Sequence, residues 1–158
     1  MTGELSNDEI TALLESEHIG HMACSDEGKP YIVPMAYLFH EEILYGQTTD
    51  GKKVQMLRKN PQVCFQVEHI EPGQWKSAIC WGTFEEMDFD DPSLKINPAN
   101  EILELLTKNL ALVQKRKGIS IPYSFKDGIQ PLTVNQKTST LFRIIITEKT
   151  GRFHKDLD

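Results

Sequence analysis

From residue 18 to residue 48 the sequence reads HIGHMACSDEGKPYIVPMAYLFHEEILYGQT, and this stretch predicts the fold class. Apolar residues dominate residues 18–25, 31–39 and 43–48, and two short polar segments separate them. Short polar turns of this kind join neighbouring antiparallel strands in β-hairpins. Pro34 lies inside the second strand, where it cannot donate a hydrogen bond to a ladder. We therefore expect an antiparallel sheet in which this strand lies at an edge, contains a bulge or faces something other than backbone.

Further helices and strands are predicted on both sides of this stretch. Ser6 and Glu9 have the spacing of a capping box, which predicts a helix that continues to about residue 17. Stripes of apolar residues predict two more helices, and apolar runs or alternation predict three more strands. These helices cover residues 51–59 and 99–114, and the strands cover residues 63–67, 77–87 and 141–147.

The remaining segments complete the predicted architecture. Residues 118–137 have no clear period, and we expect them to form a long connection that covers a site. Gly151 and Arg152 are expected to end the ordered chain. Six strands with short turns and peripheral helices predict a mainly β protein, a six-stranded antiparallel barrel in a single domain over residues 1–158.

Composition excludes several classes of protein. The chain has 158 residues, of which 39% are hydrophobic and 25% charged, an ordinary globular balance. A formal net charge of −6 disfavours nucleic-acid and anionic-membrane partners, and the apolar runs are too short to span a bilayer. Cys24, Cys64 and Cys80 are odd in number and form no CxxC pair, which argues against a disulfide framework or a zinc site. Reduced core thiols and the absence of a signal-peptide pattern predict a cytoplasmic protein.

The segment YGQTTDGKK, residues 45–53, has a composition that suits a phosphate group. It leaves a strand through Gln47, Thr48 and Thr49, whose side chains can donate hydrogen bonds, and it enters a helix at Gly51. Amides at a helix N-terminus and the helix dipole favour an anion there, and two lysines at positions 52 and 53 supply counter-charge. A polar loop with solvated lysines fits the same pattern, so both interpretations stay open at this point.

The order of several segments resembles the FMN-binding split-barrel family related to pyridoxamine 5′-phosphate oxidase. The segments are GHMA at 20–23, PYIVPMAY at 30–37, the loop at 45–53, MLRKNPQVCF at 56–65 and WKSAICWGTFE at 75–85. The likeness is closest to the branch that includes the nitroimidazole-resistance (Nim) proteins. It covers roughly residues 5–90 and resumes at the last strand, and it implies a split barrel.

The resemblance also implies a flavin site shared between the two subunits of a homodimer. Its cofactor would be FMN, with FAD possible. Along the isoalloxazine ring it places Val33, Pro34, Met35 and Ala36, and at the ring edge or ribityl chain it places Gln47, Thr48 and Thr49. It assigns the phosphate to Lys52 and Lys53, and it takes Trp75 and Ser77 from the second subunit. A packed surface aromatic and a hydroxyl at the start of a strand are the alternative interpretations of Trp75 and Ser77.

This sequence departs from its relatives in one informative place. Many Nim-like proteins carry a His-Ser pair where this chain has Gly46 and Gln47, which weakens the prediction of Nim-type nitro reduction. We expect an FMN-dependent oxidoreductase that acts on a small molecule with an electron donor. A non-catalytic flavin- or haem-binding module for storage or sensing is the alternative, and a dimeric structural protein with a degenerate pocket is a third possibility.

Overall fold

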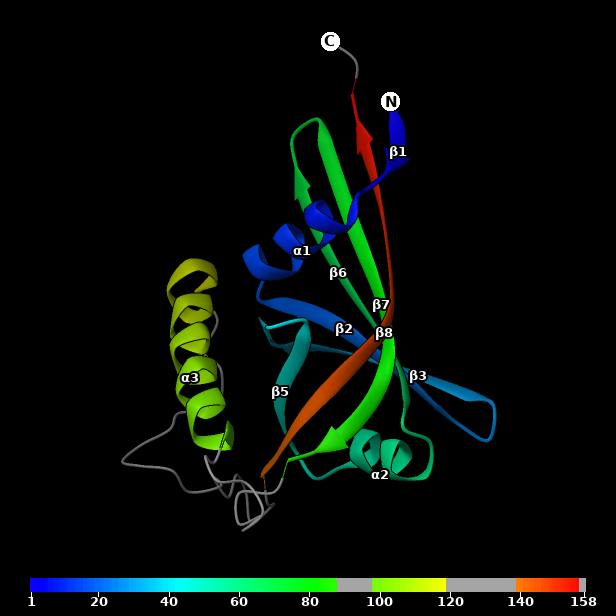
Figure 1. Cartoon of the computed structure of the whole chain (residues 1–158), viewed down its shortest axis with the longest axis vertical. Helices are drawn as coiled ribbons and strands as arrows, with labels where there is room; N and C mark the ends of the chain where they lie inside the picture. Colours follow the sequence, from blue (N-terminus) through cyan, green and yellow to red (C-terminus); the bar gives the residue numbers. More distant parts are fainter. Residues whose placement is uncertain (88–97, 119–138, 157–158) are drawn as a thin grey trace.

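The computed structural model describes residues 1–87, 98–118 and 139–156, and its strands form one antiparallel sheet (Figure 1). The strand order is β3-β2-β6-β7-β8-β5-β4, and β1 pairs with β8. The strands are β1 (Thr2–Glu4), β2 (Ile19–Asp26), β3 (Lys29–Ala36), β4 (Leu38–His40), β5 (Ile43–Thr49), β6 (Gln62–Glu71), β7 (Gln74–Glu86) and β8 (Ser139–Lys155). The helices are α1 (Asn7–Ser16), α2 (Lys52–Lys59) and α3 (Pro98–Lys117).

The sheet curls until the chain itself connects its two ends. β3 lies at one end of the strand order and β4 at the other, and Tyr37 is the single residue between them. The amide of Tyr37 donates to the His18 carbonyl at 3.1 Å, its hydroxyl donates to the Leu14 carbonyl at 2.8 Å, and its carbonyl accepts from the Asn109 side chain. The predicted single strand over residues 31–39 is therefore wrong, because these contacts interrupt it. Of the three arrangements expected around Pro34, the structure shows the edge position, because β3 lies at one end of the strand order.

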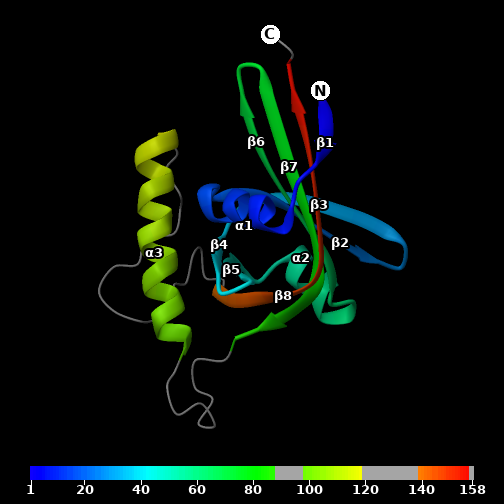
Figure 2. The same ribbon diagram turned by 45° about the horizontal axis from the view of Figure 1, so that its top comes forward.

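Two hydrophobic clusters hold the helices against the sheet. The main core lies inside the curl and includes the buried face of α1, Met56 and Leu57 of α2 and the inward side chains of the strands. Figure 2 shows α3 standing beside β4 and β5, where Ile102 and Leu106 pack on Tyr45 and Leu141 in a second, smaller cluster. The Ser6 capping box forms as predicted, with the Ser6 side chain accepting from the Glu9 amide and the Glu9 carboxylate accepting from the Ser6 amide.

One part of the sheet extends well beyond the curl (Figure 1). A β-bulge between Trp81 and Gly82 interrupts the pairing of β7 with β8. The segments of β6, β7 and β8 that lie beyond this bulge, on the side of the β6–β7 turn, form an extension together with β1. We call this extension the arm. β1 pairs there with the end of β8, so both ends of the described chain lie at the tip of the arm.

The last strand differs most from its prediction. It runs over Ser139–Lys155 rather than 141–147, and Gly151 pairs with Ala78 in its interior instead of ending the ordered chain. A Cβ at Gly151 would lie 2.8 Å from the Ile10 side chain and 2.9 Å from that of Leu5, so glycine permits this close approach. The sheet has eight strands rather than six because β1 and β4 were not expected, and the predicted fold class is confirmed.

Two further expectations concern the rest of the chain. The predicted irregular connection at 118–137 falls almost entirely outside the described residues. Among the helices of the described ranges, none has the length and apolar character needed to cross a lipid bilayer.

Candidate functional site

The N-terminus of α2 carries an unusual set of charges. Its N-cap, Gly51, has extended backbone and provides no side-chain acceptor for the first-turn amides. No acidic residue lies in the first turn, which instead contains Lys52 and Lys53. The helix dipole disfavours cations at this end by about 0.3–1 kcal/mol each. Helix stability therefore does not explain the two lysines, whereas an anion bound to free amides would.

Lys53 is the more informative of the two lysines. Its side chain is half-buried against β2, and burial lowers its pKa, an effect that the nearby Cys24 partly opposes. Within the described part of the chain, no carboxylate or hydrogen-bond acceptor pairs with this ammonium group. A desolvated charge without a partner is costly. The site is therefore suited to an anionic ligand that would supply the missing charge.

Lys52 is exposed and points toward the β2–β3 hairpin. Its ammonium lies 5.2 Å from the ring centroid of Tyr31, which is within the range of a cation–π contact. Tyr31 lies on β3 and pairs in register with Cys24 on β2. Lys52 and Lys53 thus lie near Tyr31 and Cys24, two paired residues of the same hairpin.

The acidic residue of the loop before α2 is neutralised within the protein. Asp50 accepts from Arg58 at 3.0 Å, and Arg58 also donates to Glu86 at the end of β7 at 2.6 Å. These contacts raise the pKa of Arg58 and tie the last turn of α2 to the sheet. As a result, the Asp50 carboxylate faces Arg58, and the charge at the start of α2 stays positive.

The four predicted ring-contacting residues of β3 divide between its two faces. Val33 pairs with the buried Met22 and shares the inner face with Met35, whereas Pro34 pairs with His21 on the outer face, where Ala36 also lies. His21 is a half-buried strand residue whose Nδ1 lies 3.1 Å from Gln66 Oε1. A ligand bound on one face of β3 could therefore contact only two of these four side chains.

The predicted residues of β5 divide in the same way. Thr48 is 3% exposed and faces the main core, on the same side as Leu44. Gln47 and Thr49 lie on the opposite face, where Gln47 pairs with Leu141 of the smaller cluster. Thr49 is half-buried and lies two residues before the N-cap of α2. Of the Thr48 and Thr49 hydroxyls, that of Thr49 is therefore closer in sequence to this helix.

Trp75 and Ser77 lie in the arm, far along β7 from α2. They are the second and fourth residues of β7, whereas the Arg58–Glu86 contact places α2 at the other end of that strand (Figure 1). One protomer does not bring them to the two lysines. Their assignment to a second subunit stays a prediction.

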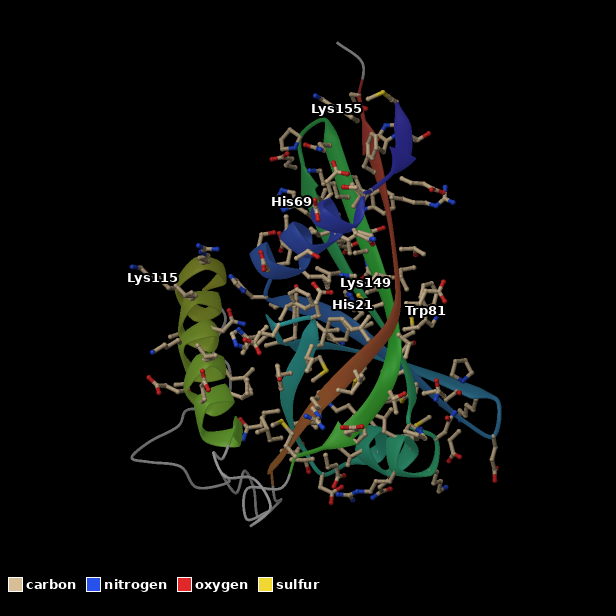
Figure 3. All side chains as sticks on the ribbon, in the orientation of Figure 1. His21, His69, Trp81, Lys115, Lys149 and Lys155 are labelled. Carbon is tan, nitrogen blue, oxygen red and sulfur yellow. The ribbon has the colours of Figure 1, made fainter. Side chains whose placement is uncertain are left out.

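The outer face of the sheet carries an apolar row that the sequence interpretation missed. Register pairs connect Ile32 to Ala23, Ala23 to Cys64 and Cys64 to Trp81 across four strands. Ile32 is 64% exposed and Trp81 is 39% exposed, and Figure 3 shows Trp81 on the side of the sheet away from α1. A shallow groove of about 270 Å³ lies between Ala23, Cys64 and Trp81. The sequence contains one signal for this row: Trp75 and Trp81 are separated by an even number of positions, which places both side chains on the same face of a strand.

Gly46 is packed too closely for a histidine. A Cβ at this position would lie 2.4 Å from Cζ of Phe142, and Phe142 is 1% exposed in the main core. A histidine at this position would require Phe142 and the surrounding core to be rebuilt.

A second cavity, of about 380 Å³, lies between α1, β6 and α3. Its Glu17 and His69 form an ion pair at 2.7 Å, and this contact raises the pKa of His69. His69 is labelled near α1 in Figure 3. Glu17 and His69 of this cavity thus pair with each other.

Comparisons with known proteins identify the family and the fold. An uncharacterized protein of Rhizobium meliloti (strain 1021) is 31% identical over 84 residues, which cover 52% of this chain and 56% of that relative, so the match spans about half its length. An FAD-binding protein from Mesorhizobium loti is 27% identical with a TM-score of 0.74, over 99% of this chain and 98% of that one. A candidate 5-nitroimidazole antibiotic resistance protein from Bacteroides thetaiotaomicron shares the fold, with a TM-score of 0.65, 17% identity and coverage of 97% and 87%. The family model of pyridoxamine 5′-phosphate oxidase matches residues 6–152. The chain therefore belongs to the pyridoxamine 5′-phosphate oxidase family.

Proposed function

We propose that this protein binds FMN at the N-terminus of α2 and acts as a flavin-dependent oxidoreductase on a small molecule. The observation that carries the proposal is Lys53, a half-buried ammonium without an ion pair among the described residues, beside helix amides that no side chain caps. The family and the FAD-binding relative from Mesorhizobium loti support a flavin as the ligand.

The residues at the start of α2 fit the phosphate of FMN. A phosphomonoester carries about 1.5 to 2 negative charges at neutral pH and accepts several hydrogen bonds. Lys52, Lys53 and the first-turn amides would hold it, and β3 and β5 would border the ring. Each phosphate of a diphosphate such as that in FAD carries a single charge, so two lysines at one helix end favour FMN. FAD is the competing ligand.

The chain would bind and orient the cofactor and limit its contact with water. When bound, the flavin supplies hydride and electron transfer, so the protein needs no nucleophile of its own. Gly46 favours the alternative of flavin binding without turnover, because it provides no titratable side chain where Nim-like relatives have histidine. Loss of the flavin absorbance on anaerobic addition of NADH or NADPH would support the enzyme, and retention of the absorbance with both donors would support the binding module.

A homodimer is the second part of the proposal. The apolar row from Ile32 to Trp81 would pack against a second copy, whose Trp75 and Ser77 would complete the site. Trp81→Asp should give a monomer with weaker flavin binding in sedimentation and titration experiments. Leu112→Glu, which alters an exposed side chain on α3, is the matched control and should stay dimeric. A wild-type monomer that binds FMN tightly would contradict this part.

The phosphate assignment is tested by comparing FMN, FAD and riboflavin, which has the same ring without a phosphate. Fluorescence titration of wild type should give the highest affinity for FMN. Lys53→Met should weaken FMN binding by about ten- to a hundredfold, because a hydrogen bond to a charged group contributes about 1.5–3 kcal/mol. Riboflavin affinity should not change. Lys108→Met, an exposed lysine on α3, controls for the loss of one positive charge. Equal affinities of wild type for FMN and riboflavin would refute the assignment.

The free thiols support a cytoplasmic location. Cys24, Cys64 and Cys80 are all free, and unpaired thiols are usual in reducing compartments. We therefore propose the cytoplasm, which fractionation of the native cells would test.

A further inference from the structure

We propose that Tyr31 is a positioning residue for the ligand phosphate: its ring holds the Lys52 ammonium at the start of α2, so that Lys52 and Lys53 act on the same anionic group. The inference rests on the proposed function, since it concerns the phosphate of the same ligand. It assigns a role to an aromatic residue that neither the loop pattern nor the resemblance singled out.

The position of Lys52 needs an explanation beyond its own helix. The side chain is exposed, and among the described residues it makes no ion pair. A lysine in this situation samples many rotamers, and fixing it on a ligand costs side-chain entropy. The Tyr31 ring, 5.2 Å from the ammonium, attracts the cation through the negative face of its π system. The ring therefore restricts Lys52 before any ligand arrives.

Tyr31 is itself firmly held. It lies on the inner face of β3, is half-buried and packs against the main core. Its register partner on β2 is Cys24, which lies near Lys53. Tyr31 and Cys24, which neighbour the two lysines, are thus one cross-strand pair. Both lysines therefore lie next to the same part of the β2–β3 hairpin.

The inference predicts an effect that depends on the phosphate and on ring electrons. Removing the ring should weaken FMN binding about two- to fivefold, the value of a cation–π contact at an exposed site, and should leave riboflavin binding unchanged. A residue that only supported the fold or packed against the flavin ring would affect both ligands.

The experiment measures FMN and riboflavin affinities of the full chain by fluorescence titration. Tyr31→Leu should lose two- to fivefold for FMN alone, and Tyr31→Phe should restore wild-type affinity. Lys52→Met should abolish the effect, so that the double variant with Tyr31→Leu binds FMN as Lys52→Met does. Additive losses, or an equal loss for riboflavin, would overturn the inference.

A second series protects the test against a folding defect in Tyr31→Leu. Phenylalanines with one, two or three ring fluorines at position 31 keep the packing nearly constant but progressively withdraw electrons from the ring. FMN affinity should fall stepwise along this series while riboflavin affinity stays level, and a flat FMN series would overturn the inference. A wild-type protein that binds neither ligand refutes the proposed function and the inference together, whereas wild-type FMN binding with a flat series refutes the inference alone.

Discussion

Gly46 offers the sharpest test of the packing, because its replacement by alanine adds one methyl group at a defined contact. The new Cβ would lie 2.4, 2.9 and 3.1 Å from three atoms of the Phe142 ring. Ordinary contacts between carbon atoms are about 3.5–4.0 Å, so the ring must withdraw by about 1 Å. Phe142 is 1% exposed and packs on Phe84 with ring centroids 5.2 Å apart, which leaves little room to move.

The magnitude follows from two opposing effects. Overpacking of this kind costs about 1–3 kcal/mol. Alanine also lowers the entropy of the unfolded chain relative to glycine, which offsets about 0.4–1 kcal/mol. We expect Gly46→Ala to lower the free energy of unfolding by up to about 2.6 kcal/mol, or the Tm by up to about 10 °C for a domain of this size.

Urea denaturation of four proteins measures the effect: wild type, Gly46→Ala, Phe142→Leu and the double variant. Leucine at position 142 removes the ring atoms that the new methyl group would meet. The double variant should therefore be less destabilised than the sum of the single variants, with a coupling of about 0.5 kcal/mol or more. Additive losses, or a Gly46→Ala variant more stable than wild type, would show that the ring can move freely and would refute the reasoning.

Three further predictions follow from buried polar and titratable groups. Asn109→Leu should lower the free energy of unfolding by about 1–3 kcal/mol in urea, because it leaves the Tyr37 carbonyl without its side-chain donor, while the neighbouring exposed Lys108→Met should have little effect. Burial lowers the pKa of Lys53, so FMN affinity should fall as the pH rises through that lowered value; Lys53→Arg should resist this fall because guanidinium stays protonated, and identical pH profiles would contradict the prediction. Burial raises the pKa of Cys80 to about 12, so its native thiol should resist alkylation until the protein unfolds, which peptide mass mapping would detect as late labelling.

Local patterns were predictable from the sequence where the determinants lie close together in the chain. The capping box at Ser6 and the start of α2 at Gly51 depend on residues within one turn, and both form as expected. The hairpin turn after β2 has Glu27 and Gly28 with positive φ, as a tight two-residue turn requires. The basic loop of the candidate site was visible for the same reason, since its glycine and lysines are consecutive.

Features that depend on distant partners were not predictable. The break at Tyr37 exists because His18, Leu14 and Asn109 satisfy its polar groups, and no local pattern announces those contacts. Gly151 suggested a chain break, yet it pairs inside β8, where the Leu5 and Ile10 side chains approach its backbone and leave no room for a Cβ. The role proposed for Tyr31 required its distance from Lys52, which only the folded chain provides.

The β-bulge in β8 makes the direction of the arm depend on chain length rather than on side chains. Gly82 pairs with Ile146 and Trp81 pairs with Glu148, so Thr147 is the extra residue, and its hydroxyl donates to the Trp81 carbonyl at 3.2 Å. Deleting Thr147 would keep the pairs on both sides, and thus the same side chains toward the core, but would remove the bend and extra twist that a bulge imposes. Short deletions or insertions at this position, more than substitutions, are therefore the genetic changes that would re-aim the arm relative to the barrel.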